Sequence, residues 1–203
     1  PNIVNIYDIS ANLGKAYIAM EFVNGQSLHA YLREKGPLSA REAINYMVQA
    51  CSALEAIHKA GIVHRDIKPD NIMIAQGGLV KLMDFGLAKA EDARMTSSGV
   101  VMGTPAYMSP EQARGQDVDC VSDIYSIGLV LHEMLTGKTF FRTGDVIARQ
   151  MTEMPPLPST MAEGIPQALD EVVMKCISKD PKERYQTAEE LAIALRAVTE
   201  NKE

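Results

Sequence analysis

The sequence predicts an α+β fold in which strands are few and helices make up most of the chain. Two apolar-rich segments, residues 2–10 and 15–20, flank a turn at Asn12-Leu13-Gly14, which is typical of short antiparallel strands. Farther along, apolar residues recur at helical spacing between residues 39 and 61 and between residues 122 and 137. Strands followed by long helices favour the α+β class.

The first two helices are marked by their capping residues. Ser27 precedes a helical segment from Leu28 to Glu34 and is its expected N-cap. Ser39 begins the next helix, with Glu42 three residues later as a capping box, and Gly61 ends it. The apolar stripe of this second helix is expected to be core, and it consists of Ile44, Met47, Val48, Cys51, Leu54 and Ile57.

The rest of the chain predicts one hairpin and further helices. Residues 71–75 and 79–82 flank Gln76-Gly77-Gly78, which indicates a short hairpin. The segment from Ser122 to Gly137 is too apolar to lie on the surface as a helix, so we expect it to be buried. A helical lobe is completed by residues 143–151, 167–178 and 187–198, with a proline-rich loop at residues 154–158.

Composition narrows the class of protein. The chain has 203 residues, of which 46% are hydrophobic, enough for one domain with a sizeable core. Its net charge of −6 gives no reason to expect nucleic acid or an anionic membrane as the main partner. Cys51, Cys120 and Cys176 lack metal-ligand spacing and are expected to be reduced thiols in a cytoplasmic protein. No apolar run approaches the length of a membrane span, and no signal peptide is recognisable.

Two short motifs stand out between the second helix and the hairpin's end. Residues 62–71 read I-V-H-R-D-I-K-P-D-N, and residues 82–89 read L-M-D-F-G-L-A-K. Each motif alone is weak, because a lone Asp-Phe-Gly is usually a turn and a lone Asp before Pro or Asn is usually a cap. Their joint order and spacing match the H-R-D-x-x-x-x-N and D-F-G motifs of protein kinases.

The chain therefore resembles the eukaryotic-like serine/threonine protein kinases, and M-S-P-E-Q-A-R-G and S-D-I-Y-S-I-G are most similar to the bacterial branch. The resemblance implies a protein-kinase-like fold, mainly the helical C-terminal lobe with the last strands of the N-terminal lobe. Residues 1–20 would end the small lobe, residues 21–26 would form the hinge, and residues 27–203 would form the large lobe.

The resemblance implies that the cofactors are ATP and Mg²⁺. Asp66 would be the catalytic base and Lys68 a contact of the γ-phosphate, while Asn71 and Asp84 would bind the metal through hard oxygen ligands.

It also implies an adenine site at the hinge. The backbones of Glu21 and Val23 would bind the adenine, Met20 would control access behind it, and Met73 would lie beneath it. A strand end that packs into the core explains residues 20–23 equally well, and packing in the core explains Met73 equally well. Ser27 could contact the ribose instead of capping a helix, and capping is the preferred interpretation.

The activation loop of the family falls in residues 90–101, with Thr96, Ser97 and Ser98 at its centre. Arg65 marks kinases whose loop is ordered by phosphorylation, and Lys89 would share its contact with the phosphate. A disordered serine-rich loop is the alternative.

Four further residues have structural roles in the family. Thr104 would bond near the catalytic aspartate, which favours serine or threonine over tyrosine as substrate. Glu111 would pair with Arg184 as a buried link. Asp123 would hold the backbone of the catalytic loop, the alternative being an ordinary carboxylate at a helix N-terminus.

The expected reaction is transfer of the ATP γ-phosphate to serine or threonine hydroxyls of protein substrates, with a possible homodimer for autophosphorylation. The chain begins at Pro1 rather than at a methionine, which suggests a fragment. It contains no Gly-rich loop, strand lysine or helix glutamate of the family, so the fragment alone is expected to be inactive, and its intact parent could be membrane-anchored. The alternatives are a pseudokinase that acts as a binding module and a small-molecule phosphotransferase of the aminoglycoside type. The long segment between residues 84 and 111 argues against the latter.

Overall fold

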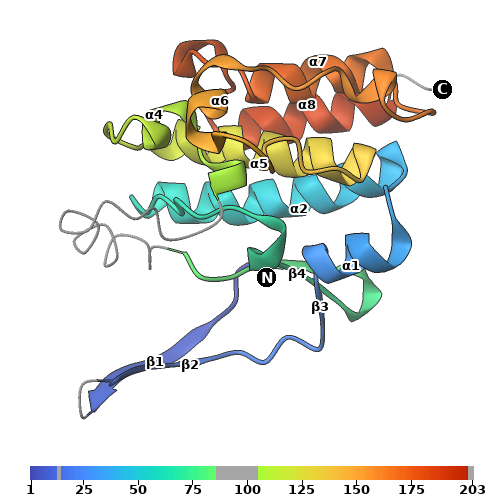
Figure 1. Cartoon of the computed structure of the whole chain (residues 1–203). Coiled ribbons are helices and arrows are strands. Elements are labelled where there is room, and N and C mark those ends of the chain that lie inside the picture. Colours follow the sequence, from blue (N-terminus) through green and yellow to red (C-terminus); the bar gives the residue numbers. More distant parts are fainter. Residues whose placement is uncertain (13–14, 86–104, 201–203) are drawn as a thin grey trace.

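The structure, a computed structural model, describes residues 1–12, 15–85 and 105–200. It confirms the α+β class, because five short strands accompany a helical body (Figure 1). The strands are β1 (Ile6–Asn12), β2 (Lys15–Met20), β3 (Gly25–Ser27), β4 (Ile72–Ala75) and β5 (Val80–Leu82). The helices are α1 (Leu28–Lys35), α2 (Ala40–Lys59), α4 (Pro110–Ala113), α5 (Cys120–Thr136), α6 (Val146–Thr152), α7 (Gln167–Cys176) and α8 (Ala188–Glu200). Short 3₁₀ turns occur at η1 (Pro69–Asn71), η2 (Gln76–Gly78), η3 (Pro105–Tyr107), η4 (Pro158–Thr160) and η5 (Pro181–Glu183).

Helix α2 forms as its sequence predicts. Ser39 accepts a hydrogen bond from the backbone nitrogen of Glu42 at 3.3 Å, and the predicted apolar stripe lies in the core, with only Val48 half-buried. The second half of the expected capping box is replaced, because the Glu42 carboxylate accepts hydrogen bonds from the hydroxyls of Tyr31 and Tyr46. These bonds tie α2 to α1, whose N-cap is Ser27, with its hydroxyl 3.2 Å from the nitrogen of Ala30.

Helix α5 is the centre of the helical body and packs between α2 and α7 (Figure 1). Every residue from Val121 to Thr136 is buried, as the apolar sequence predicts. The helix begins at Cys120, two residues before the expected start, because Asp119 caps it by accepting a hydrogen bond from Val121. It ends at Gly137, which adopts a left-handed φ of 69° and donates to the carbonyl of Glu133.

The first strand begins later than the sequence suggests. We expected a strand from Asn2, but β1 starts at Ile6 and pairs with β2 in a separate antiparallel hairpin. The preceding residues are held elsewhere: the nitrogen of Leu82 donates to the carbonyl of Asn2 at 2.8 Å, and that of Val4 donates to the carbonyl of Leu82 at 2.9 Å. Residues 2–4 therefore bond to β5 instead of extending β1, which is why β1 is shorter than expected.

The predicted hairpin of residues 71–82 is present as β4 and β5, but a third strand, β3, joins it. Strand β3 uses Gly25 and Gln26, which the sequence assigned to the hinge. A Cβ at Gly25 would lie 2.1 Å from the carbonyl oxygen of Ile74, so glycine is needed for this pairing. The sheet brings the end of the expected hinge against β4, which lies between the two kinase-like motifs.

The later helices differ from their expected ranges at the ends. Asp145 caps α6 by accepting from Ala148 at 3.0 Å, so that helix starts at Val146 instead of Thr143. Helix α4 was not expected, and it begins at Pro110 after the cap Ser109. Among the described residues, the helices are all too short or too polar to cross a membrane.

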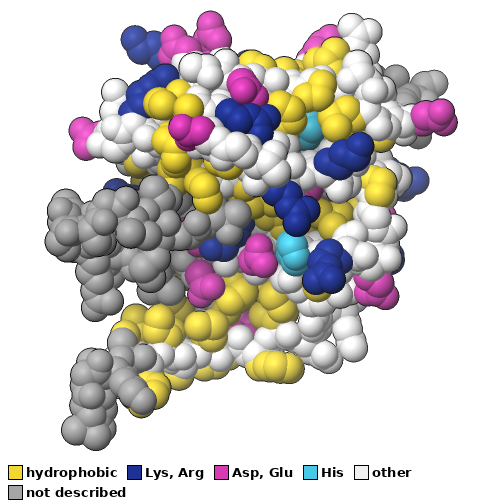
Figure 2. All heavy atoms as spheres, viewed as in Figure 1, with side chains coloured by type: hydrophobic (Ala, Val, Ile, Leu, Met, Phe, Trp, Pro, Cys, Tyr) yellow, Lys and Arg dark blue, Asp and Glu magenta, His cyan; other side chains and the backbone are white. Residues whose placement is uncertain are grey.

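The surface shows two features of the fold. Basic and acidic side chains are interspersed over the face drawn in Figure 2, as expected for a chain whose net charge is modest. Hydrophobic side chains gather in the lower part of that figure over β1 and β2, where Ile6, Tyr7, Ile9 and Tyr17 are exposed.

Candidate active site

The loop between α2 and β4 brings three candidate residues together. The Nζ of Lys68 lies 2.6 Å from Oδ2 of Asp66. The Nδ2 of Asn71 donates to the same Oδ2 at 2.9 Å and to the backbone carbonyl of Asp66 at 2.8 Å. The Asp66 side chain remains 44% exposed. An accessible carboxylate is therefore held in one orientation by a cation and an amide.

The backbone of this loop is held from below by Asp123. Its carboxylate accepts hydrogen bonds from the backbone nitrogens of His64 at 2.8 Å and Arg65 at 2.9 Å, and it lies 2.7 Å from Nε2 of His58. Asp123 is buried at the start of α5, so the central helix carries the support for the loop. Arg65 has a left-handed φ of 68°, which an L-residue adopts only when its surroundings hold it there.

His64 joins the two motifs as a neutral side chain. It is fully buried, and this burial lowers its pKa below the ordinary value of 6.5. Its Nε2 lies 3.0 Å from the carbonyl of Met83, and its Nδ1 accepts from the backbone nitrogen of Asp66 at 3.3 Å. This pattern fits the tautomer with the proton on Nε2.

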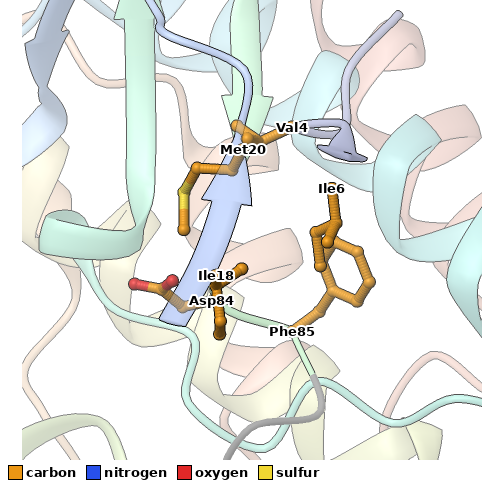
Figure 3. Close-up of a pocket in the computed structure, with 6 residues that line it drawn as sticks. All are labelled: Val4, Ile6, Ile18, Met20, Asp84 and Phe85. Atoms are coloured by element: carbon orange, nitrogen blue, oxygen red, sulfur yellow. The ribbon is translucent and has the colours of Figure 1, made fainter. Parts of the chain in front are cut away.

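Asp84 lies at the same end of the β4–β5 ladder as Asn71. Ile72 is opposite Leu82, and the nitrogen of Met83 donates to the carbonyl of Asn71 at 3.0 Å. Asp84 has a left-handed φ of 61°. Its carboxylate lines a pocket whose other walls are apolar (Figure 3), formed by Val4, Ile6, Ile18, Met20 and Phe85.

The oxygens near this end suit a hard divalent cation. Both bonds from Asn71 to Asp66 use the amide nitrogen Nδ2. The amide oxygen Oδ1 therefore does not face the aspartate. An amide oxygen and the Asp84 carboxylate are ligands that Mg²⁺ accepts when water and phosphate oxygens complete its shell. In the described ranges there is no group of three His, Cys, Asp or Glu residues that could hold a metal without such help.

Glu21, which is expected to lie in the hinge, is held by Lys81, a residue that the sequence did not single out. Lys81 Nζ lies 2.7 Å from Oε1 and 2.9 Å from Oε2 of Glu21, and Asn5 donates to Oε2 through its backbone and side chain. The bonds from Lys81 and Asn5 lower the pKa of Glu21 below 4.5. The sequence signal for Lys81 is a single charged residue inside the apolar strand V-K-L.

The other hinge candidates lie around this pair. Met20, at the end of β2, reaches toward Asp84 in Figure 3. Val23 is half-buried, and half-buried Met73 lies opposite Lys81 in the β4–β5 pairing. Of these candidates, Met20 lines the pocket beside Asp84.

Glu111 and Arg184 form a buried pair between α4 and the turn before α8. Nη1 of Arg184 lies 2.8 Å from Oε1 and Nη2 lies 3.0 Å from Oε2 of Glu111, and Ser122 also donates to Oε1. Burial alone would raise the pKa of Glu111, but the hydrogen bonds from Arg184 and Ser122 and the charge of Arg184 outweigh it and lower the pKa to about 2.

A second buried polar bridge reaches the segment before α4. The Nε2 of Gln150, on α6, donates to the carbonyls of Ala106 at 2.8 Å and Pro105 at 3.3 Å, and its Oε1 accepts from Tyr125 at 2.7 Å. Lys179 donates to both Tyr125 and the backbone of Gln150, and burial, followed by the charge of Arg184, lowers the pKa of Lys179 to about 8. Nothing in the local sequence singles out Gln150.

Several predicted residues fall outside the described ranges. These are Lys89, Thr96, Ser97, Ser98 and Thr104, together with Gly86 of the second motif.

The sequence is similar to proteins of known family. Residues 1–194 match the model of the protein kinase domain. A probable serine/threonine-protein kinase PknB of Bifidobacterium longum is 47% identical over 206 residues, covering 94% of this chain and 30% of that protein. The serine/threonine-protein kinase PknB of Mycobacterium leprae is 45% identical over 201 residues, covering 94% and 32%. A probable serine/threonine-protein kinase of Clostridium acetobutylicum is 42% identical over 204 residues, covering 98% and 31%. The chain thus spans about a third of the length of these curated relatives.

Proposed function

The chain belongs to the protein kinase family, and we propose that the intact protein uses this site to transfer the γ-phosphate of ATP to serine or threonine hydroxyls of proteins. The observation that carries the proposal is the geometry at Asp66. Its exposed carboxylate is oriented by Lys68 at 2.6 Å and by Asn71 at 2.9 Å, on a backbone that Asp123 supports.

In the proposed reaction, Asp66 orients the acceptor hydroxyl and takes its proton. The hydroxyl oxygen forms a bond to the γ-phosphorus as the bond between that phosphorus and the bridging oxygen of ADP breaks, and ADP leaves. Lys68 lies beside the carboxylate, where its positive charge is placed to contact the transferred phosphoryl group. Mg²⁺, held by Asn71 and Asp84, would neutralise charge on the phosphates.

Adenine would bind along the hinge. The backbone nitrogen of Glu21 already donates to the carbonyl of Asn5 at 2.8 Å, so the groups left for adenine are the Glu21 carbonyl and the backbone of Val23. Met20, which lines the pocket beside Asp84, and Met73 would contact the ring.

The 203 residues contain no Gly-rich loop and no paired strand lysine and helix glutamate of the kind that cover and bind ATP phosphates in kinases. We therefore propose that residues 1–203 by themselves transfer phosphate at no measurable rate. A clear rate of peptide phosphorylation by these residues alone would contradict this.

Two other functions compete with this proposal. A small-molecule phosphotransferase would use the same lobe plan, and a binding module would retain the fold without chemistry. The retention of Asp66, Lys68, Asn71 and Asp84 favours chemistry, and the S-P-E-Q segment that follows residue 108 favours a protein acceptor.

The test is to incubate the intact protein with Mg²⁺ and ATP labelled on the γ-phosphate. A general protein substrate and a panel of aminoglycosides would serve as acceptors, and hydrolysed protein would be analysed for phosphoamino acids. We expect phosphoserine and phosphothreonine on the protein substrate and on the enzyme itself. If one enzyme molecule phosphorylates another, the rate of autophosphorylation per molecule should rise with the enzyme concentration. Label on the aminoglycosides alone would favour the small-molecule enzyme. Absence of all transfer would favour the binding module.

A further inference from the structure

We infer that Gln112 is a positioning residue for the reaction: its side-chain amide fixes the peptide group between Arg65 and Asp66 and so sets the direction of the Asp66 carboxylate. The inference rests on the function proposed above. Gln112 belongs to α4 and lies in the M-S-P-E-Q-A-R-G segment, but it is not among the expected site residues.

The Gln112 amide is held at both ends. Its Nε2 donates to the carbonyl of Arg65 at 2.8 Å, and its Oε1 accepts from the backbone nitrogen of Ser109 at 2.9 Å. The hydroxyl of buried Ser109 in turn accepts from the nitrogen of Gln112 at 3.3 Å, which completes a capping box. Because the oxygen is used by Ser109, the amino group of the amide must face the catalytic loop.

The peptide that Gln112 holds is one that needs support. Arg65 is left-handed, a conformation that residues with a Cβ disfavour, and its nitrogen is bound by Asp123 on α5. Its carbonyl is bound by Gln112 on α4. Asp123 on α5 thus holds the backbone nitrogen of Arg65, and Gln112 on α4 holds its carbonyl. The bond from Gln112 acts on the peptide group that joins Arg65 to Asp66.

Helix α4 is a firm base for this contact. Glu111, adjacent to Gln112, is fixed by the buried guanidinium of Arg184 and by the hydroxyl of Ser122. The donor of Gln112 is therefore anchored in the helical body rather than in a surface turn. A displacement of α4 would move the Arg65 carbonyl and, through it, Asp66.

Replacement of Gln112 by glutamate separates positioning from capping. A glutamate at this third helical position is a good capping-box acceptor, so it keeps the bond from Ser109. A carboxylate has no hydrogen to donate, however, and it would place an oxygen against the Arg65 carbonyl. If Gln112 only caps α4, Gln112→Glu is harmless. If Gln112 positions the loop, Gln112→Glu impairs catalysis.

The experiment measures steady-state kinetics of the intact protein with a serine peptide. We expect Gln112→Glu to lower kcat about tenfold, equivalent to about 1.4 kcal/mol, with KM for ATP and for peptide unchanged within about twofold. The unfolding temperature should fall by only a few degrees, because one hydrogen bond is lost while the cap of α4 is kept. Exposed Gln116 provides the matched control, because Gln116→Glu makes the same chemical change on the same segment and should leave kcat unchanged.

Hydrogen exchange of the intact protein gives a readout that needs no activity. Peptides covering residues 62–71 should exchange faster in Gln112→Glu and not in Gln116→Glu, because the Arg65 peptide loses its support. The inference is overturned if Gln112→Glu has the same kcat and the same exchange rates as the wild-type protein. It is also overturned if kcat falls while the exchange of residues 62–71 stays the same. If the wild-type protein transfers no phosphate at all, the proposed function fails, and the exchange data alone decide whether Gln112 holds the loop.

Discussion

Replacing Glu111 with glutamine should destabilise the protein strongly. The Arg184 side chain is fully buried and that of Glu111 is 9% exposed, and two hydrogen bonds join them at 2.8 and 3.0 Å. Glutamine keeps the shape of glutamate, but it removes the negative charge and turns a donor toward the guanidinium. The guanidinium would remain among carbonyl oxygens of Val121, Ser178 and Lys179 without a counter-ion.

Loss of one partner of a buried ion pair costs ~3–5 kcal/mol. The whole free energy of unfolding of a domain is about 5–15 kcal/mol, so Glu111→Gln would remove a large share of it. At ~2–4 °C per kcal/mol for a domain of this size, the transition should fall by roughly 6–20 °C. Differential scanning calorimetry of the intact protein would follow the transition, with exposed Glu163→Gln as the matched control.

The same pair predicts a dependence on pH. The pKa of Glu111 in the folded protein is about 2, below its ordinary value of 4.5, so its stabilising contribution is fully present above pH 4.5 and is lost as the pH falls toward 2. The difference in stability between wild type and Glu111→Gln should therefore shrink over this range.

A cost of less than about 1 kcal/mol for Glu111→Gln at pH 7 would contradict a buried and coupled pair, because a loss that small is typical of exposed ion pairs. Replacing both partners with apolar residues, Glu111→Leu with Arg184→Met, should recover most of the loss, since neither charge is then buried alone.

Two further predictions concern the hinge and the core. Lys81→Met removes both contacts to Glu21 and should raise KM for ATP about fivefold, or ~1 kcal/mol, without changing kcat. The control Lys138→Met, at an exposed lysine, should change neither constant. An unchanged KM in Lys81→Met would show that Lys81 does not shape the expected hinge. Gly128→Ala would place a Cβ 2.5 Å from the Cβ of Cys176 and should cost ~1–3 kcal/mol in urea unfolding; a cost below about 0.5 kcal/mol would contradict the close approach of α5 and α7.

The long helices could be predicted from the sequence because their signals are local and repeated. The stripe of α2 recurs over about four turns behind a serine cap. The sequence of α5 is too apolar for a surface helix, so it predicts burial. The loop around Asp66 was also predictable, because Asp66, Lys68 and Asn71 are close in sequence and bring one another into contact.

The features that were missed depend on long-range contacts or on very short segments. Strand β3 has three residues, too few to show a period, and it exists because β4 lies beside it. Residues 2–4 join Leu82 of β5, which lies 78 to 80 positions later in the chain. Gln112 reaches Arg65 across 47 positions, and a polar residue on a four-residue helix has an equally good local explanation as a cap. The pairing of Glu111 with Arg184 was expected only from the resemblance, since 73 positions separate them.

The most direct test of the account is the rate of phosphate transfer by the intact protein after substitution of a single aspartate in the catalytic loop. Asp66→Asn keeps the size of the side chain but cannot take the proton of the acceptor hydroxyl, so kcat should fall on the order of 10²–10⁴-fold. Asp70→Asn is the matched control, because Asp70 lies four residues away in the same loop and is exposed, and kcat should stay near the wild-type value. A wild-type rate in Asp66→Asn, or equal losses in both variants, would contradict the assignment of Asp66 as the base.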